Sequence, residues 1–181
     1  MLASGTTYEH PASGGRLTIV EHWTDNAERR FVFERSLPPG TGRLDAHKHL
    51  DHHQRYEVLA GTATIEIGRR KERLAVGESV DLPPGTGHRD PYNDGLGELV
   101  YRGTFEPVTP FLHAYVPTLA EAFRTGRTNR QDELPRLWTF VVLRASKAET
   151  FAAQIPMIVQ GMLRPVLAAV GRLRGYRAVI E

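Results

Sequence analysis

Breaks rich in proline and glycine divide the middle of the chain into short segments, and this punctuation limits the possible fold more than any other feature. Pro38–Gly40 and Pro83–Gly85 are the strongest of these breaks. The segments between the breaks are rich in β-branched and aromatic residues, and short strands at this spacing are typical of an antiparallel sandwich or barrel. We expect strands at Arg16–His22, Arg30–Ser36, Arg43–His49, Gln54–Ala60, Thr62–Ile67, Arg73–Val76, Gly77–Leu82 and Leu99–Phe105.

The pattern changes after Pro110, where apolar residues recur at helical spacing. We expect helices over Phe111–Thr125, Leu134–Ser146 and Lys147–Leu173. Ser146 and Glu149 have the spacing of a capping box for the third helix, and Pro156 and Pro165 should kink or split it. One face of this helix is an apolar stripe, formed by Ile155, Ile158, Val159, Met162, Leu163, Val166, Leu167 and Val170.

These patterns indicate one mostly β domain within 181 residues. Residues 1–15 are rich in glycine, serine and threonine and are expected to form a loose arm. Residues 16–110 would form the barrel, and residues 111–181 a helical extension packed on the barrel or on a partner subunit. The apolar stripe and its arginines are also compatible with an anionic membrane surface. Because two prolines interrupt the stripe, we favour packing on protein and expect a homodimer.

The charge and the cysteine content exclude several classes of function. A net charge of +2, without clustered basic and aromatic residues, argues against a nucleic-acid partner. The chain has no cysteine, so disulfides, thiolate catalysis and thiolate metal sites are ruled out. The first residues lack the pattern of a secretory signal, and no apolar segment is long enough to cross a bilayer, so we expect a cytoplasmic protein.

Four of the eight histidines lie within seven residues, and they indicate a metal site. On a strand, residues two apart point to the same face, so His47 and His49 can present two imidazoles to one cation. Neutral imidazole suits Fe, Mn, Ni, Zn and Cu. His52 and His53 follow Asp51 in a turn and are expected to be exposed or to lie at the mouth of a cavity.

Two blocks of the sequence resemble the two cupin motifs. The first cupin motif is a glycine, HxH, an acidic residue and, after six residues, a glycine; the second is a glycine, five residues, PxGxxH and an asparagine. The matching residues are Gly42, His47, His49, Gln54 and Gly61 in the first block, and Gly77, Pro83, Gly85, His88 and Asn93 in the second. The resemblance covers about residues 30–106. It departs from the motif at Gln54, where the family has glutamate, and by one residue of spacing at Gly42 and Asn93.

This resemblance implies a single-domain, cupin-2-like jelly roll that holds one divalent transition metal (Fe, Mn, Ni, Zn or Cu) inside the barrel. It places His47, His49 and His88 on the metal. Gln54 would be either a fourth ligand or a hydrogen-bonding partner of a ligating histidine. The alternative is a barrel in which these side chains are polar filler and no metal binds.

Gln54 also changes the chemistry that the resemblance implies. A neutral amide leaves a divalent ion at its full charge, which favours small anionic or chelating ligands in the barrel. An amide cannot act as a general base, which argues against isomerase schemes that need a carboxylate at this position. Tyr56 and Val58 share the face of Gln54 and should line the cavity, with Tyr56 as a catalytic hydrogen-bond donor; Asp45 shares the face of the histidine pair. Tyr92 is a second possible proton donor.

Three functions follow from this interpretation. The leading one is a mononuclear metal-dependent oxidoreductase of the dioxygenase type, because three histidines leave positions for a bidentate substrate and O₂. The alternatives are a non-catalytic, metal-dependent sensor or binding module and a sugar isomerase or epimerase. The fold hosts all three, so the sequence does not choose among them.

Overall fold

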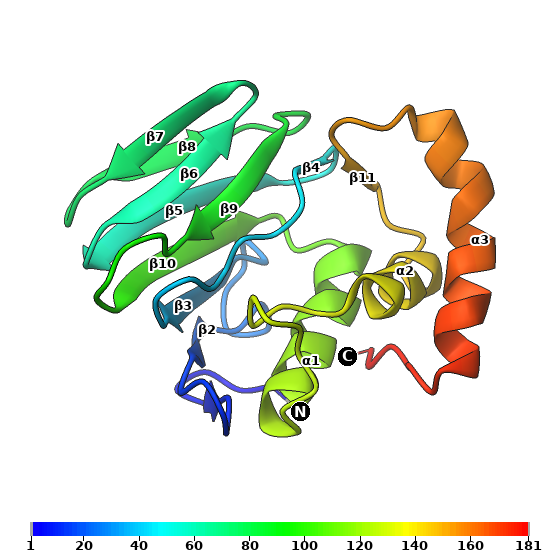
Figure 1. Ribbon diagram of the computed structural model, residues 1–181, viewed down its shortest axis with the longest axis horizontal. Helices are drawn as coiled ribbons and strands as arrows, with labels where there is room; N and C mark the ends of the chain where they lie inside the picture. Colours follow the sequence, from blue (N-terminus) through cyan, green and yellow to red (C-terminus); the bar gives the residue numbers. More distant parts are fainter. Residues whose placement is uncertain (1, 181) are drawn as a thin grey trace.

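The computed structural model describes residues 2–180 and consists of two antiparallel sheets with three helices on one side (Figure 1). The strands are β1 (Thr7–Glu9), β2 (Arg16–Glu21), β3 (Phe31–Leu37), β4 (His47–His49), β5 (His53–Ala60), β6 (Ala63–Ile67), β7 (Arg70–Leu74), β8 (Ser79–Leu82), β9 (His88–Tyr92), β10 (Leu99–Glu106) and β11 (Thr150–Ala152). The helices are α1 (Pro110–Arg124), α2 (Arg136–Ala145) and α3 (Met157–Leu173).

The strands form a two-sheet jelly roll. One sheet has the order β1-β2-β3-β10-β5-β8, and the other has the order β11-β4-β9-β6-β7. Strands far apart in sequence are therefore neighbours, as with β3 and β10 or β4 and β9. The mostly β jelly roll with C-terminal helices that the sequence predicts is confirmed.

The core lies between the inner faces of the sheets. Along β10 burial alternates, and Leu99, Tyr101 and Phe105 are buried. Gly103 pairs with Phe33 on β3, and a Cβ at position 103 would overlap the Phe33 ring. The close approach therefore requires glycine. The Phe33 ring packs against Phe105, with 5.1 Å between ring centroids, and continues the aromatic core toward the helices.

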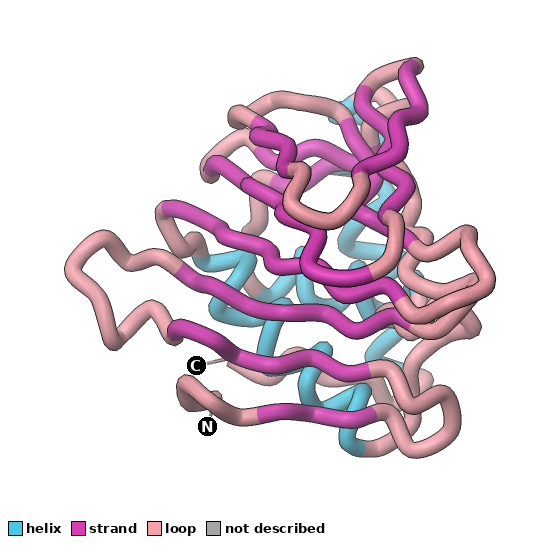
Figure 2. The backbone as a smooth tube through the Cα atoms, turned by 90° about the vertical axis from the view of Figure 1, so that its left-hand side faces the viewer, coloured by secondary structure: helices cyan, strands magenta, loops and turns pink. Residues whose placement is uncertain are grey.

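The helices lie together on one side of the sheets, which Figure 2 shows from the opposite, strand side. Pro110 occupies the first turn of α1, where its missing N–H costs no hydrogen bond. The helix buries Phe111, Leu112 and Phe123. The first two predicted helices are confirmed to within two residues at each end. None of the helices within residues 2–180 is both long and apolar enough to span a membrane.

Two predictions for the ends of the chain are wrong. Part of the expected loose arm is strand β1, where Thr7 pairs with Thr18 of β2, and Leu2 is buried in the core. The third helix does not begin after Ser146, because the Ser146 hydroxyl donates to the Val142 carbonyl and the following residues lead into β11.

The third helix begins only at Met157, so the expected capping box does not form. Pro156 directly precedes α3 rather than splitting it, because the fixed φ of proline suits a helix start. Pro165 lies inside α3, which continues on both sides of it. The strands β9 and β11 were not predicted, since both are short and β9 contains Pro91.

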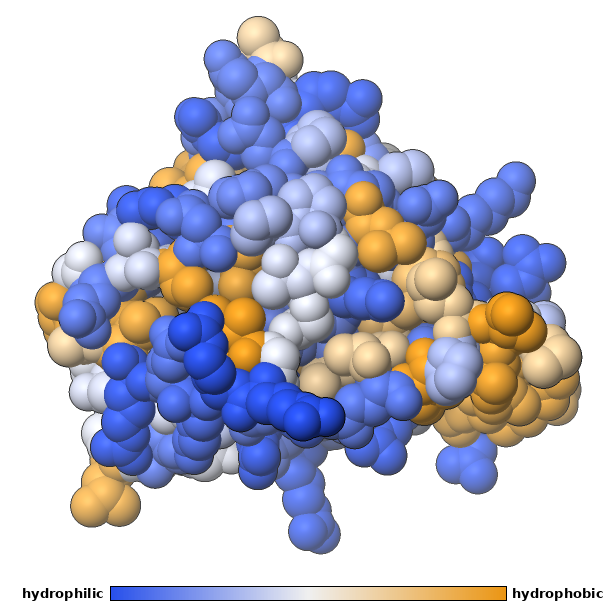
Figure 3. Space-filling model, turned by 90° about the horizontal axis from the view of Figure 1, so that it is seen from above, coloured by the Kyte–Doolittle hydropathy of each residue, from blue (hydrophilic) through white to orange (hydrophobic). Residues whose placement is uncertain are grey.

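The apolar stripe of α3 does not pack on the barrel. Ile158 is 80% exposed, Met162 65% and Val166 59%. Figure 3 shows apolar side chains gathered on the side of the molecule where α3 lies. The opposite face of α3 packs on α2 through Ala168 and Gly171, which are buried. Packing of the stripe on the barrel was therefore a wrong prediction, and packing on a partner subunit stays a prediction.

We expect Gly171→Ala to loosen the contact between α3 and α2. A Cβ at this position would lie 2.6 Å from the Leu137 carbonyl oxygen and 2.8 Å from a Val141 methyl group. The free energy of unfolding should fall by about 1–3 kcal/mol, the usual cost of overpacking. The measurement is urea unfolding followed by circular dichroism.

Gly161→Ala is the matched control in the same helix. Its Cβ would meet no atom within 4 Å, so the substitution should raise the free energy of unfolding by about 0.5–1 kcal/mol through helix propensity alone. Equal stability of the two variants would contradict the close packing of α3 on α2.

Candidate metal centre

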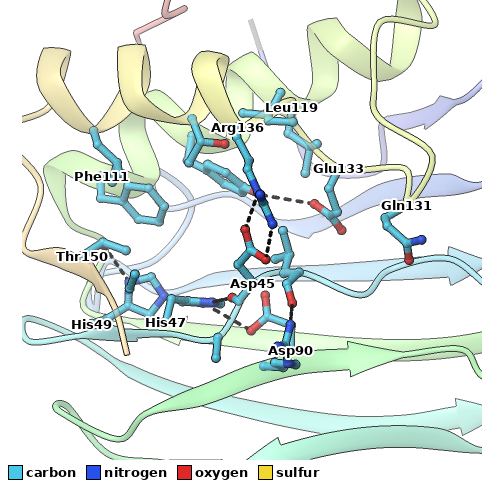
Figure 4. Close-up of a pocket in the computed structure, with 18 of the residues that line it drawn as sticks. Asp45, His47, His49, Asp90, Phe111, Leu119, Gln131, Glu133, Arg136 and Thr150 are labelled. Atoms are coloured by element: carbon cyan, nitrogen blue, oxygen red, sulfur yellow. Dashed lines mark hydrogen bonds and ion pairs between the residues drawn. The ribbon is translucent and has the colours of Figure 1, made fainter. Parts of the chain in front are cut away.

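Three histidines from two strands converge at one point of the barrel. His47 and His49 lie two residues apart on β4 and share a face. His88 lies on β9, directly opposite His47 in the register of the two strands. One nitrogen from each imidazole lies within 4.8 Å of the other two, so the three rings can hold one metal ion. The structure thus brings together the three histidines that the sequence singled out, and Figure 4 shows two of them, His47 and His49, at the cavity.

The other nitrogen of each imidazole is held from outside the cluster. His47 Nδ1 donates to the Asp45 carbonyl at 2.9 Å, and His88 Nδ1 donates to the Thr86 carbonyl at 2.9 Å. His49 Nδ1 forms a 2.8 Å hydrogen bond with the Thr150 hydroxyl. All three Nε2 atoms are therefore left for a ligand, which is the usual arrangement around a protein-bound metal.

Strand β11 supplies Thr150, a residue that no sequence pattern predicted for the site. Residues 150–152 pair with β4 in antiparallel register, with Thr150 opposite His49 and Ala152 opposite His47. In Figure 1 this strand extends the sheet at its β4 edge, between α2 and α3 in the chain. The C-terminal part of the chain thus helps to build the centre as well as to cover the barrel.

Burial keeps the imidazoles of β4 neutral. Desolvation, with help from the neighbouring histidines, holds the pKa of His49 well below its ordinary value. Desolvation also lowers the pKa of His47, although the charge of Asp90 opposes it. Neutral imidazole is the form that binds metals. His88 Nε2 is buried and has no hydrogen-bond partner of good geometry within residues 2–180, so the cluster has an unused ligand atom that a metal would satisfy.

Gln54 is buried near the cluster and lines the cavity. Its amide nitrogen lies 3.4 Å from Nε2 of His52. Ligation of a metal by Gln54 stays a prediction. His52 is 1% exposed and its ring lies against that of His49, with 4.4 Å between centroids, so the expectation that it is exposed or at the cavity mouth is wrong. His53 is exposed, as expected.

Asp90 is a site residue that the sequence reasoning missed. Its Oδ1 lies 3.2 Å from Nε2 of His88 and 3.7 Å from Nε2 of His47. Tyr56, which is fully buried, donates a 2.8 Å hydrogen bond to the same oxygen. Burial would raise the pKa of Asp90, but its contacts with His47, His88 and Tyr56 outweigh burial and hold that pKa well below its usual range. Spacing could have revealed Asp90, since it follows His88 by two residues on one strand.

A cavity of about 650 Å³ opens beside the histidines, between the sheets and the helices. Much of its wall is aromatic or aliphatic and includes Phe33, Phe105 and Phe111. Asp45 also lines it, but its carboxylate is turned away from the histidines and accepts hydrogen bonds from Arg136 of α2 at 2.7 and 2.9 Å (Figure 4). Asp45 was predicted to share the face of the histidine pair, and its carboxylate is bound to Arg136.

A buried ion pair forms another part of the cavity wall. Arg35 of β3 lies 3.1 Å from Glu133, which precedes α2, and both side chains are 4% exposed. Tyr115 of α1 donates a hydrogen bond to the second oxygen of Glu133 at 3.2 Å. Burial raises the pKa of Glu133 to about 7, against the opposing charge of Arg35.

Tyr92, the second possible proton donor, does not line this cavity, and its hydroxyl donates to Glu66 at 3.0 Å.

Comparison with protein-family models gave no match, and neither did comparison with curated proteins. Solved structures do resemble the chain. A sugar phosphate isomerase of the cupin superfamily from Silicibacter pomeroyi is 17% identical, with a TM-score of 0.47, over 59% of this chain and 70% of that one. A protein described as a predicted oxalate decarboxylase, from Thermotoga maritima, is 17% identical, with a TM-score of 0.49, over 60% and 100%.

A cupin-like protein from Thermotoga maritima is 20% identical, with a TM-score of 0.46, over 60% of this chain and 81% of that one. At such identities the likeness concerns the fold alone. The fold rests on this chain's own features, which are the two antiparallel sheets and the histidines that converge from β4 and β9. These features give the chain the two-sheet jelly roll that the motif resemblance implies.

Proposed function

We propose that the chain is a mononuclear metal-dependent oxidoreductase of the dioxygenase type that acts on a small anionic or chelating substrate. The observation that carries this proposal is the set of three imidazoles, two buried and one half-buried, whose Nδ1 atoms are all engaged, so that three Nε2 atoms are left for a metal. Three protein ligands on a divalent ion leave positions for a substrate. The adjoining cavity has the volume of a small-molecule site.

The charges in the cavity support an anionic substrate. Its lining includes four arginines (Arg35, Arg43, Arg89 and Arg136) and three carboxylates (Asp45, Asp90 and Glu133). A divalent ion would make this balance more positive. Arg35 is among the arginines that line the cavity, and its Nε is buried and has no hydrogen-bond partner within residues 2–180.

The chain's own residues would prepare the site for reaction. When bound, a transition metal supplies Lewis-acid and redox chemistry. Thr150 and the carbonyls of Asp45 and Thr86 orient the imidazoles. The apolar wall keeps water away from the substrate, which strengthens every charge interaction inside the cavity.

A sugar isomerase or epimerase is a second candidate, and one observation favours it. The neutral Gln54 argues against proton transfer at the usual position, but Glu133 lines the same cavity with a pKa of about 7. A carboxyl group that titrates near neutrality suits general acid–base catalysis. The two candidates differ in whether a redox-active metal and O₂ are needed.

Protein purified without a histidine tag should carry one divalent transition metal per chain, measured by elemental analysis. His47→Ala combined with His49→Ala should abolish this metal, because both ligands on β4 are lost. Circular dichroism should show that the double variant keeps its strands. Full metal occupancy in a folded double variant would sink the assignment of the site.

The reaction class can be tested on protein that has been stripped of metal and reloaded with Fe(II) or Zn(II). Oxygen uptake is followed with small chelating anions such as catechols and 2-oxo acids, and isomerisation is followed with sugar phosphates. We expect oxygen uptake that needs both Fe(II) and a chelating anion. Isomerisation with Zn(II) and no oxygen uptake would support the second candidate, and ligand binding without turnover would indicate a binding module.

We also propose that a second copy of the chain covers the exposed apolar face of α3. This face carries Ile158, Met162, Leu163 and Val166, all exposed, while the opposite face of the helix is already packed on α2. Exposed apolar patches of this kind mark interaction surfaces. Two chains that pack through this face of α3 would form the homodimer that the sequence predicts.

Leu163→Asp should turn the dimer into a folded monomer, because Leu163 is 48% exposed in the single chain and a charge there opposes burial at an interface. Light scattering coupled to gel filtration gives the mass. Leu96→Asp is the control, since Leu96 is fully exposed in the loop before β10. A monomeric wild type would refute the dimer, and its binding to anionic vesicles would assign the face to a membrane.

A further inference from the structure

We propose that Asp90 supplies the carboxylate ligand of the metal centre and so takes over the charge that Gln54 lacks. The inference rests on the proposed metal centre and goes beyond it by naming the fourth ligand. The motif resemblance offers only position 54 for this role. The geometry points to a residue on a different strand, β9 in place of β5.

The position of the Asp90 carboxylate fits that of a ligand. Its Oδ1 lies 3.2 Å from His88 Nε2 and 3.7 Å from His47 Nε2. Ligand bonds to a transition metal are about 2.1 Å long, so two neighbouring ligand atoms at right angles stand about 3 Å apart. The carboxylate oxygen therefore lies beside two of the imidazoles at nearly the spacing of ligands on one ion.

The unsatisfied state of His88 points the same way. Nε2 of His88 is buried and lies close to Oδ1 of Asp90, but the two atoms do not form a hydrogen bond of good geometry. A buried polar atom without a partner is costly. If Nε2 of His88 and Oδ1 of Asp90 both point at a shared ion, each is satisfied without a direct bond between them.

Tyr56 completes this arrangement as a positioning residue. It is 1% exposed, and its hydroxyl donates to the same oxygen of Asp90 at 2.8 Å. Hydrogen bonds of this kind commonly hold ligating carboxylates in place. This hydrogen bond satisfies the buried hydroxyl of Tyr56, so Tyr56 needs no direct contact with the substrate.

Gln54 is neutral and does not offset the charge of a bound divalent ion, whereas the carboxylate of Asp90 would offset part of it. The amide nitrogen of Gln54 lies 3.4 Å from His52, a histidine outside the converging set. Three neutral imidazoles and one carboxylate reduce the charge of a divalent ion from +2 to +1. From a neutral set of ligands, the sequence predicts affinity for anions. With Asp90 as a ligand, that affinity would depend on the arginines of the cavity, above all on Arg35.

The test uses Co(II) alone, added to the metal-free full chain. Asp90→Asn keeps the size of the side chain but removes its charge, and we expect Co(II) affinity to fall about tenfold to a hundredfold. The visible absorption of the bound Co(II) should also change, because one oxygen ligand is altered. Asp81→Asn on β8 is the control: it removes a carboxylate that is paired with Arg55 and does not line the cavity, and it should leave both the affinity and the spectrum unchanged.

Wild-type affinity together with a wild-type Co(II) spectrum in Asp90→Asn would overturn the proposal. If Asp90→Asn does not fold, Gln54→Glu combined with Asp90→Asn provides a second variant. It places a carboxylate on β5 in place of the one lost from β9. Tight Co(II) binding by this variant, with an altered spectrum, supports the proposal. The double alanine variant of His47 and His49 distinguishes failure of the metal centre from failure of the role of Asp90. If it loses Co(II) while Asp90→Asn binds normally, the metal centre stands and only the role of Asp90 fails.

Discussion

The pairing of β4 on both of its edges is the interaction on which the candidate centre depends. This strand is three residues long, too short to hold a fixed place by itself. On one edge β9 sets His88 opposite His47, and on the other β11 sets Thr150 opposite His49. Each neighbour thus adds a group to the imidazoles of β4, one a third imidazole and the other a hydrogen bond that fixes a ring.

The sequence predicts the parts of the centre that depend on local spacing. The two-residue step from His47 to His49 predicts a shared face, and the motif resemblance adds His88. Asp90 obeys the same spacing rule, but it lies in a polar segment before Pro91 that does not look like a strand. Thr150 had no local signal at all, because its role comes from a contact with His49 across 101 positions. Periodicity likewise predicts an apolar face on α3 but not what covers it.

The buried ion pair of Arg35 and Glu133 is a costly element of the interior. Moving two charges out of water costs free energy that their attraction only partly returns, so apolar residues would serve a purely structural core as well or better. Both groups lie in the cavity wall, and Arg35 keeps a donor free. The proposed function gives this pair a role that fold stability alone does not.

The place of β11 also has a consequence for the order of assembly. The barrel strands β1–β10 are complete by Glu106, but Thr150 reaches His49 only after both α1 and α2 have been made. Pairings between residues so far apart in the chain form late, because a long loop must close first. A growing chain on the ribosome therefore contains all three histidines well before Thr150 can fix the orientation of His49, so the geometry of the cluster is a property of the finished protein.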